Sequence, residues 1–268
     1  MRLAARVPIA AAALLVAGTP VWAQDPVPIQ DNSFLIEEAY NQESGVVQHV
    51  STFSRAEGGN WHYSFTQEWP LGGIRHQLSY TVPVLDAGIG TGIGDVAVNY
   101  RFQAAGNPMA SFVAAPRVSL IVPSGSETRG RGTGAVAVQG NLPVSLVLAP
   151  RIVAHLNAGG TVTPSAHGLA GARATTTGAH LGASMVWLAR PNLNLLVESI
   201  WMSDGVVTGE GATDRVEQAF INPGVRFAFD AGRVQVVPGI AYTIGIGPSS
   251  GSDALFLYLS LEHSFRGE

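Results

Sequence analysis

The 268-residue sequence contains neither cysteine nor lysine, so all 15 of its basic residues are arginines. Without cysteine the chain forms no disulfide, no thiolate metal site and no lipid-modified thiol. Without lysine it has no Schiff-base amine and no phosphate-loop lysine. The glycine-rich stretch at 88–94 therefore predicts a flexible loop rather than a nucleotide site, and no cofactor is expected.

Charge is also scarce, because charged residues make up 13% of the chain, compared with about 25% in an ordinary soluble domain. Removal of residues 1–23 would take away Arg2 and Arg6. The 13 remaining arginines would then face 19 acidic residues, a formal net charge of −6. This balance argues against nucleic acid as a partner.

No apolar run is long enough for a transmembrane helix, which needs roughly 20 residues. The apolar run at 7–17, interrupted only by Pro8, follows Arg2 and Arg6, and the small-residue pattern VWA stands at 21–23. Together these features predict a secretory signal peptide over residues 1–23 that is cleaved after Ala23. The protein is therefore expected to be exported.

The rest of the chain alternates apolar and polar residues, as strands with two unlike faces do. At 255–265, for example, the leucines share one face, while Tyr258, Ser260 and Glu262 share the other. Twelve such strands are predicted, at 46–54, 61–69, 77–84, 95–102, 111–122, 136–146, 151–157, 180–187, 193–201, 221–229, 234–244 and 255–265.

The connections between these strands alternate between short turns and longer, glycine-rich loops. The longer loops are expected at 86–94, 123–134, 164–178, 203–218 and 247–253. Short periplasmic turns and longer external loops are typical of outer-membrane barrels. The sequence thus predicts an all-β fold, a closed antiparallel transmembrane β-barrel of about 12 strands over residues 46–268, in the bacterial outer membrane. A secreted soluble all-β protein is the alternative.

Such a location implies membrane lipid and lipopolysaccharide as surroundings. It also implies the barrel-insertion machinery as a partner. Outer-membrane proteins usually finish on an aromatic residue, which this machinery recognises, and the last predicted strand here ends on Phe265. The trailing residues 266–268 depart slightly from that pattern.

Several motifs resemble one known family. They are DNSFLIEEAYNQE at 31–43, GVVQH at 45–49, FTQEWPL at 65–71, HQLSY at 76–80 and GIGDV at 92–96. The sequence is similar here to the outer-membrane barrel proteins labelled for the meta-cleavage pathway of phenol degradation. The resemblance is close over about residues 31–103. Beyond them only the general pattern of the sequence is similar. It implies a transporter-like barrel, without assigning a substrate or catalytic residues.

The segment at 24–45 precedes the first predicted strand. Helical spacing would bring Phe34, Glu37, Glu38 and Asn41 near one another. This segment is predicted either to plug the lumen, with Phe34, Glu37 and Glu38 facing inward, or to pack in the periplasm beneath the barrel.

Charged residues on the polar strand faces form the candidate pore lining, since opposed charges along a pore select permeants. They are Glu68, Asp95, Arg101, Arg117, Arg151, Glu198 and Arg226. The favoured function is passage of a small-molecule permeant, apolar or aromatic. The alternative is a closed, non-conducting barrel, held together by these charges, with a structural or binding role.

A less favoured reading is an outer-membrane hydrolase, which needs a serine, a histidine and an orienting residue within hydrogen-bond reach. Ser184 and His180 are its candidates, beside His62, His76, His155 and His263. No nucleophile motif marks any of them, so no catalytic residues are assigned and the protein is not expected to be an enzyme. No histidine pair at a ligand spacing is supported by a carboxylate, so no metal site is predicted.

Overall fold

The computed structural model describes residues 33–107, 109–168 and 171–265. The predicted signal peptide at 1–23 and the start of the 24–45 segment lie outside the described residues. The strands are β1 (Val46–Ala56), β2 (Trp61–Pro70), β3 (His76–Asp86), β4 (Gly92–Ile93), β5 (Val96–Phe102), β6 (Phe112–Ala114), β7 (Arg117–Val122), β8 (Ala137–Ala149), β9 (Ile152–His167), β10 (Arg173–Arg190), β11 (Leu193–Gly209), β12 (Ala212–Phe227), β13 (Phe229–Ala231), β14 (Val234–Gly245) and β15 (Ala254–Ser264).

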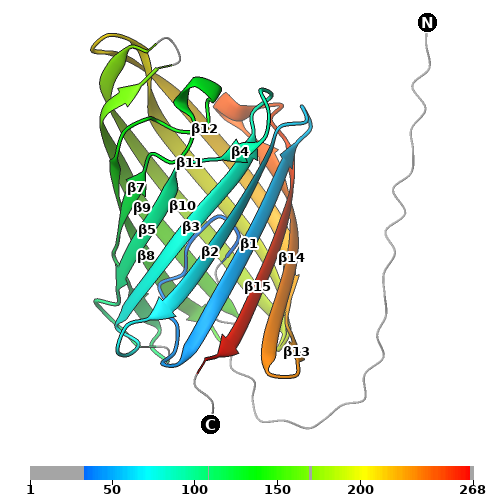
Figure 1. Cartoon of the computed structure of the whole chain (residues 1–268). Helices are drawn as coiled ribbons and strands as arrows, with labels where there is room; N and C mark the ends of the chain where they lie inside the picture. The colour runs from blue at the N-terminus through cyan, green and yellow to red at the C-terminus, as the bar shows by residue number, and fades with distance from the viewer. Residues whose placement is uncertain (1–32, 108, 169–170, 266–268) are drawn as a thin grey trace, which may run out of the picture.

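Twelve of these strands form one closed antiparallel barrel, as the sequence predicted (Figure 1). The first and last strands pair from Val46↔Ser264 to Ala56↔Ala254, and β12 pairs with β14 to complete the ring. The short strands β4, β6 and β13 add local pairings with β3, β8 and β14. Closure gives neighbouring strands hydrogen-bond partners all round, which the interior of a membrane requires.

Burial along the strands is the reverse of that in a soluble protein. On β15, Leu255 and Leu257 point outward and are 41% and 40% exposed, whereas Tyr258 and Ser260 point inward and are 3% and 0% exposed. Exposed large apolar side chains also cover the outer faces of β5, β7–β11 and β14. An apolar exterior around a polar interior is the pattern that a bilayer imposes on a barrel.

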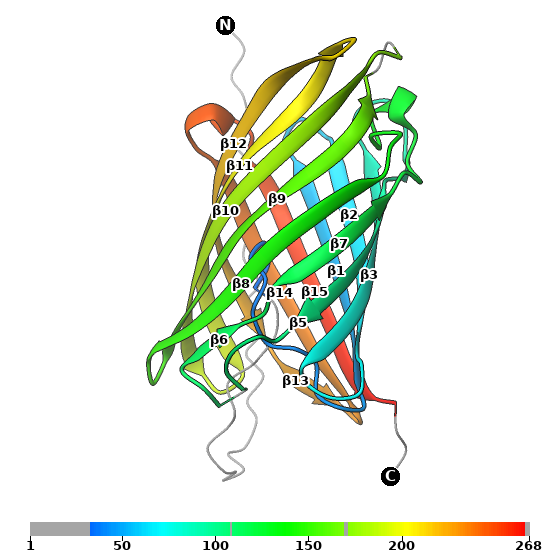
Figure 2. The ribbon, with the colours of Figure 1, turned by 90° about the vertical axis from the view of Figure 1, so that its left-hand side faces the viewer.

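Two of the predicted loops are wrong. Residues 164–178 and 203–218 mostly continue the strands, since β9 runs to His167, β10 begins at Arg173, and β11 and β12 form a long hairpin that closes at 210–211. Figure 2 shows the β11–β12 hairpin reaching beyond the neighbouring rim. These polar residues still pair as strands, as Ser203↔Glu217 does. The loss of apolar alternation therefore marks where the sheet leaves the membrane, not where it ends.

Residues 33–45, called the lumenal segment below, cross the inside of the barrel (Figures 1 and 2). The segment contains no helix, contrary to the helical spacing suggested by its sequence. Several of its backbone N–H groups donate to side chains of the barrel wall instead of to carbonyls one helical turn back. No helix among the described residues has the length and apolar character needed to span a membrane.

Candidate functional site

Glu198 on β11 binds the start of the lumenal segment. Its carboxylate accepts the backbone N–H groups of Leu35, at 2.9 and 3.2 Å, and Ile36, at 3.1 Å. Asn222 on β12 donates its Nδ2 to the same carboxylate at 2.8 Å. Glu198 is fully buried, so each of these charge-assisted bonds is stronger than a neutral one at the surface.

Neutral side chains bind the middle of the segment. Asn157 on β9 accepts the N–H of Glu37 through Oδ1 at 2.9 Å and donates Nδ2 to the carbonyl of Glu37 at 2.8 Å. Ser145 on β8 accepts the N–H of Ala39 at 2.8 Å. The wall thus provides the hydrogen bonds that a strand partner would otherwise provide.

The far part of the segment is held by β3 and β5. Gln77 accepts the N–H of Gln42 at 2.7 Å. Arg101 donates to Asn41 Oδ1 at 2.8 Å and to the carbonyls of Glu38 and Tyr40 at 3.1 and 2.6 Å. These bonds complete a set of contacts that runs around the lumen from β11 to β3.

Two glutamates of the segment form ion pairs with arginines of the wall. Glu37 lies 2.9 Å from Arg117 on β7, and Glu38 lies 3.2 Å from Arg226 on β12. The pair of Glu38 and Arg226 is almost wholly buried, with side chains 4% and 1% exposed, whereas Glu37 and Arg117 remain 27% and 18% exposed. Breaking the buried pair should cost more, because its charges lack water.

Tyr40 adds a titratable group to the segment. Burial, together with the nearby charge of Glu38, raises the pKa of Tyr40 to about 12. Its ring also packs edge-on against His155 at 6.4 Å between centroids. Tyr40 therefore stays neutral in the docked segment at any ordinary pH.

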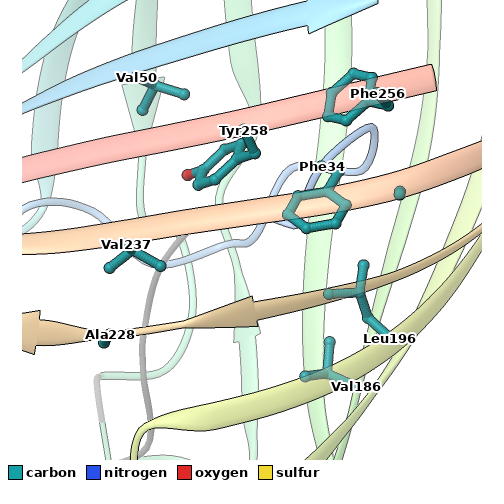
Figure 3. Close-up of a cluster of buried hydrophobic side chains, with 9 residues drawn as sticks. Phe34, Val50, Val186, Leu196, Ala228, Val237, Phe256 and Tyr258 are labelled. Carbon is teal, nitrogen blue, oxygen red and sulfur yellow. The ribbon is translucent and has the colours of Figure 1, made fainter. Parts of the chain in front are cut away.

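An apolar patch of the lumen holds Phe34, at the start of the segment (Figure 3). The ring of Phe34 lies 5.2 Å from that of Tyr258 and 5.6 Å from that of Phe256. A Cβ atom on Gly224 or Gly239 would come within 2.5 Å of the ring, so these glycines make room for it. The rest of this socket consists of Val50, Val186, Leu196, Ala228, Val237 and Ala241.

Five of the seven predicted pore-lining residues face the lumen in or beside this network. They are Glu68, Arg101, Arg117, Glu198 and Arg226. Asp95 instead lies near the long loops, where its carboxylate accepts the N–H groups of Gly125 and Thr133 at 2.9 and 2.8 Å. Arg151 is exposed in the turn between β8 and β9 and takes no part in the lumenal network.

The sequence reasoning missed the neutral residues that hold the segment. Ser145, Asn157, Gln77 and Asn222 all lie on inward faces and are nearly or wholly buried. Their only sequence signal is that inward position, which they share with residues that contact nothing on the segment. His155, a catalytic candidate from the sequence, lies 3.4 Å from Glu38 in the same network.

The proposed catalytic pair is not assembled. Ser184 Oγ contacts Ser33 Oγ at 3.1 Å, whereas His180 Nε2 contacts Asn141 Oδ1 at 3.1 Å. A different serine and histidine do meet: Ser145 Oγ lies 2.8 Å from His155 Nδ1.

This second serine–histidine pair is covered while the lumenal segment is docked. Ser145 and His155 are each 1% exposed, and the serine oxygen already accepts the N–H of Ala39. The arrangement therefore holds the lumenal segment in place. No group of three or more histidine, aspartate or glutamate side chains suited to a metal occurs within the described ranges.

Known structures share this architecture, although no protein-family model and no curated protein sequence matches the chain. An outer membrane channel from Pseudomonas putida F1 superposes with a TM-score of 0.61 at 14% identity, covering 85% of this chain and 98% of that one. The NanC porin gives 0.54 at 6% identity, covering 82% and 100%, and the KdgM porin gives 0.51 at 9%, covering 82% and 99%. At these identities the likeness shows the fold. The closed barrel, its apolar outer face and this shared fold place the protein in the bacterial outer membrane.

Proposed function

We propose that the protein is an outer-membrane channel for small molecules and that the lumenal segment closes it in the conformation described. The observation that carries this proposal is how the segment is attached. It is held by side chains of the wall and adds no strand to the sheet. Its departure would break those contacts and leave every strand pairing intact.

Release of the segment would leave a charged lumen. Three arginines, Arg101, Arg117 and Arg226, would face three glutamates, Glu68, Glu198 and Glu262, a formal balance of 3 − 3 = 0. Removal of one arginine would make this set negative, and a negative constriction attracts cations and repels anions. The opened channel should therefore select weakly between ions and should shift toward cations when a lumenal arginine is removed.

The socket of Phe34 supports a more specific proposal, that permeants include apolar or aromatic molecules. With Phe34 withdrawn, the rings of Phe256 and Tyr258 and the aliphatic residues around them would line the path. Sites for small apolar ligands are lined in this way, with few polar groups. The resemblance to barrels labelled for phenol degradation points in the same direction, although that label identifies no substrate.

Planar-bilayer conductance tests the channel. The intact mature protein should be silent most of the time, whereas a variant lacking residues 33–43 should show discrete, salt-dependent steps. A matched control replaces the same residues with a glycine–serine sequence of equal length, which keeps the chain length but supplies none of the contacts. A silent deletion variant that still shows the heat-modifiable mobility of a closed barrel would contradict the proposal.

A non-conducting barrel is the second candidate, and the filled lumen favours it. The buried pair of Glu38 and Arg226 and the buried anchor Glu198 are features that a permanent interior would also have. In that case the deletion variant would lose thermal stability without gaining conductance. Conductance and stability, measured on one preparation, therefore separate the two functions.

A further inference from the structure

Two histidines from the first and last strands face one another on the outside of the barrel. His49 on β1 and His263 on β15 have their Nε2 atoms 3.2 Å apart, and their ring planes are 21° apart with centroids at 5.3 Å, so the two Nε2 atoms face one another. In the strand register Val47 lies opposite His263, so the histidines are diagonal neighbours on one face. Gln48, beside His49, is buried in the lumen, and the imidazoles therefore point outward.

A backbone contact fixes which nitrogen of His263 holds the proton. Its Nδ1 lies 3.2 Å from the carbonyl oxygen of Ser264, which can only accept a hydrogen bond. The proton is therefore on Nδ1, and the neutral ring has its lone pair on Nε2, which faces His49. Metal-binding histidines are oriented in the same way, with the second ring nitrogen donating to a carbonyl or carboxylate.

The position of the other ring is also restrained. His49 stacks on Phe65 of β2, with centroids 6.1 Å apart and planes 25° apart. With no metal bound, His49 donates Nε2–H to the lone pair of His263. When a metal takes the place of that hydrogen, His49 carries its proton on Nδ1 instead, so both rings remain neutral and no net proton is released.

The spacing of the two nitrogens fits a metal. Zinc binds histidine nitrogen at about 2.0–2.1 Å in tetrahedral geometry, so two ligand nitrogens lie roughly 3.3–3.4 Å apart. We propose that His49 and His263 bind a divalent transition metal such as Zn²⁺ on the outer face of the barrel. The pair lies near the rim where β1 begins and β15 ends, so the protein supplies two ligands and water at the rim completes the coordination.

The site would join the two ends of the barrel sequence. His49 and His263 are 214 positions apart in the chain and meet only when β1 has paired with β15. A metal held by both binds the closed barrel much better than the unfolded chain, so binding stabilises the closed form. The inference is independent of whether the lumen conducts.

A thermal assay with zinc tests the site. The unfolding temperature of the mature protein, followed by heat-modifiable gel mobility, should rise by about 5 °C in ZnCl₂ at roughly 100 times the Kd. His49→Gln and His263→Gln should each abolish the rise. His76→Gln is the matched control and should retain it, because His76 is also outward-facing but contacts Tyr100 Oη, at 2.6 Å, instead of a second histidine.

Paramagnetic resonance of the Cu²⁺-loaded protein gives a second readout that does not depend on stability. The wild type should show coupling to two histidine nitrogens, and each single variant coupling to one. The proposal is overturned if the wild type shows no coupling to two nitrogens. It is also overturned if the zinc-dependent rise in unfolding temperature persists in a variant that carries both His49→Gln and His263→Gln, or if His76→Gln removes that rise.

Discussion

The two sides of the lumen hold the same short segment by different means. Toward β14 and β15 an apolar socket encloses Phe34, next to the charged anchors Glu198 and Arg226 on β11 and β12. Toward β3, β5 and β7 all the contacts are charged or polar. Apolar contact resists release because water must then cover the exposed surface. Ion pairs and hydrogen bonds can be exchanged for water at lower cost. The apolar side should therefore contribute more to closure, and the charged side should decide what passes.

Phe34→Ala should have the largest effect, because it empties the socket. Loss of a buried phenylalanine costs about 3–5 kcal/mol, and a cost of ~3 kcal/mol would raise the ratio of open to closed channel about 100-fold. Single-channel recording measures this ratio. Phe34→Leu fills most of the socket and should open the channel far less, and equal opening by both variants would argue against a role for the ring.

Glu198→Leu should have the next largest effect, since it removes the acceptor for two backbone N–H groups of the segment. Bonds to a charged group contribute about 1.5–3 kcal/mol each, although relief of the buried charge offsets part of this. An increase in open probability of about 10-fold is expected. Glu198→Gln retains an acceptor oxygen of the same shape and should stay close to wild type.

Alkaline pH should loosen the segment through Tyr40. The docked phenol has its pKa raised to about 12, whereas a released one titrates near 10. Below pH 10 both states are protonated and docking is unaffected. Between pH 10 and 12 only the released state ionises, so docking weakens as pH rises. Open probability measured across this range should increase in wild type and much less in Tyr40→Phe.

The smallest effect concerns selectivity. In the variant that lacks residues 33–43, Arg117→Ala or Arg226→Ala changes the formal balance of the lumen from 0 to −1. Reversal potentials in a salt gradient should shift by a few millivolts toward cation preference. Arg151→Ala is the control, because that arginine is exposed in a turn and should leave the potential unchanged. If both lumenal variants also leave it unchanged, these arginines do not line the path.

The barrel was predictable because lipid imposes a strict rule on sequence. The alternation at 255–265 and at the other eleven predicted strands follows from one face meeting hydrocarbon, and the twelve-strand count is confirmed. The hairpins at 164–178 and 203–218 escaped prediction because that rule lapses outside the membrane. Their strands continue through backbone pairing, which polar side chains neither require nor prevent.

The lumenal site was less predictable, because it depends on contacts between distant positions. A charge on the polar face of a predicted strand identified Arg101, Arg117 and Glu198. The same criterion also selected Arg151, which lies in a turn. The glycines at 224 and 239 carry no sign of the ring that they accommodate. The segment itself shows helical spacing, but several of its N–H groups donate to side chains of the barrel wall. These bonds depend on tertiary structure and leave no signal in the local sequence.

A disulfide lock tests the central claim most directly. The chain has no cysteine, and Ser33 Oγ lies 3.1 Å from Ser184 Oγ, so Ser33→Cys with Ser184→Cys would join the segment to β10. The oxidised protein should lose even the infrequent openings of the wild type, and addition of dithiothreitol to the same bilayer should restore them, while either single variant should not respond. Full conductance with the disulfide formed would contradict the account, because the channel would then be open with its segment still in place.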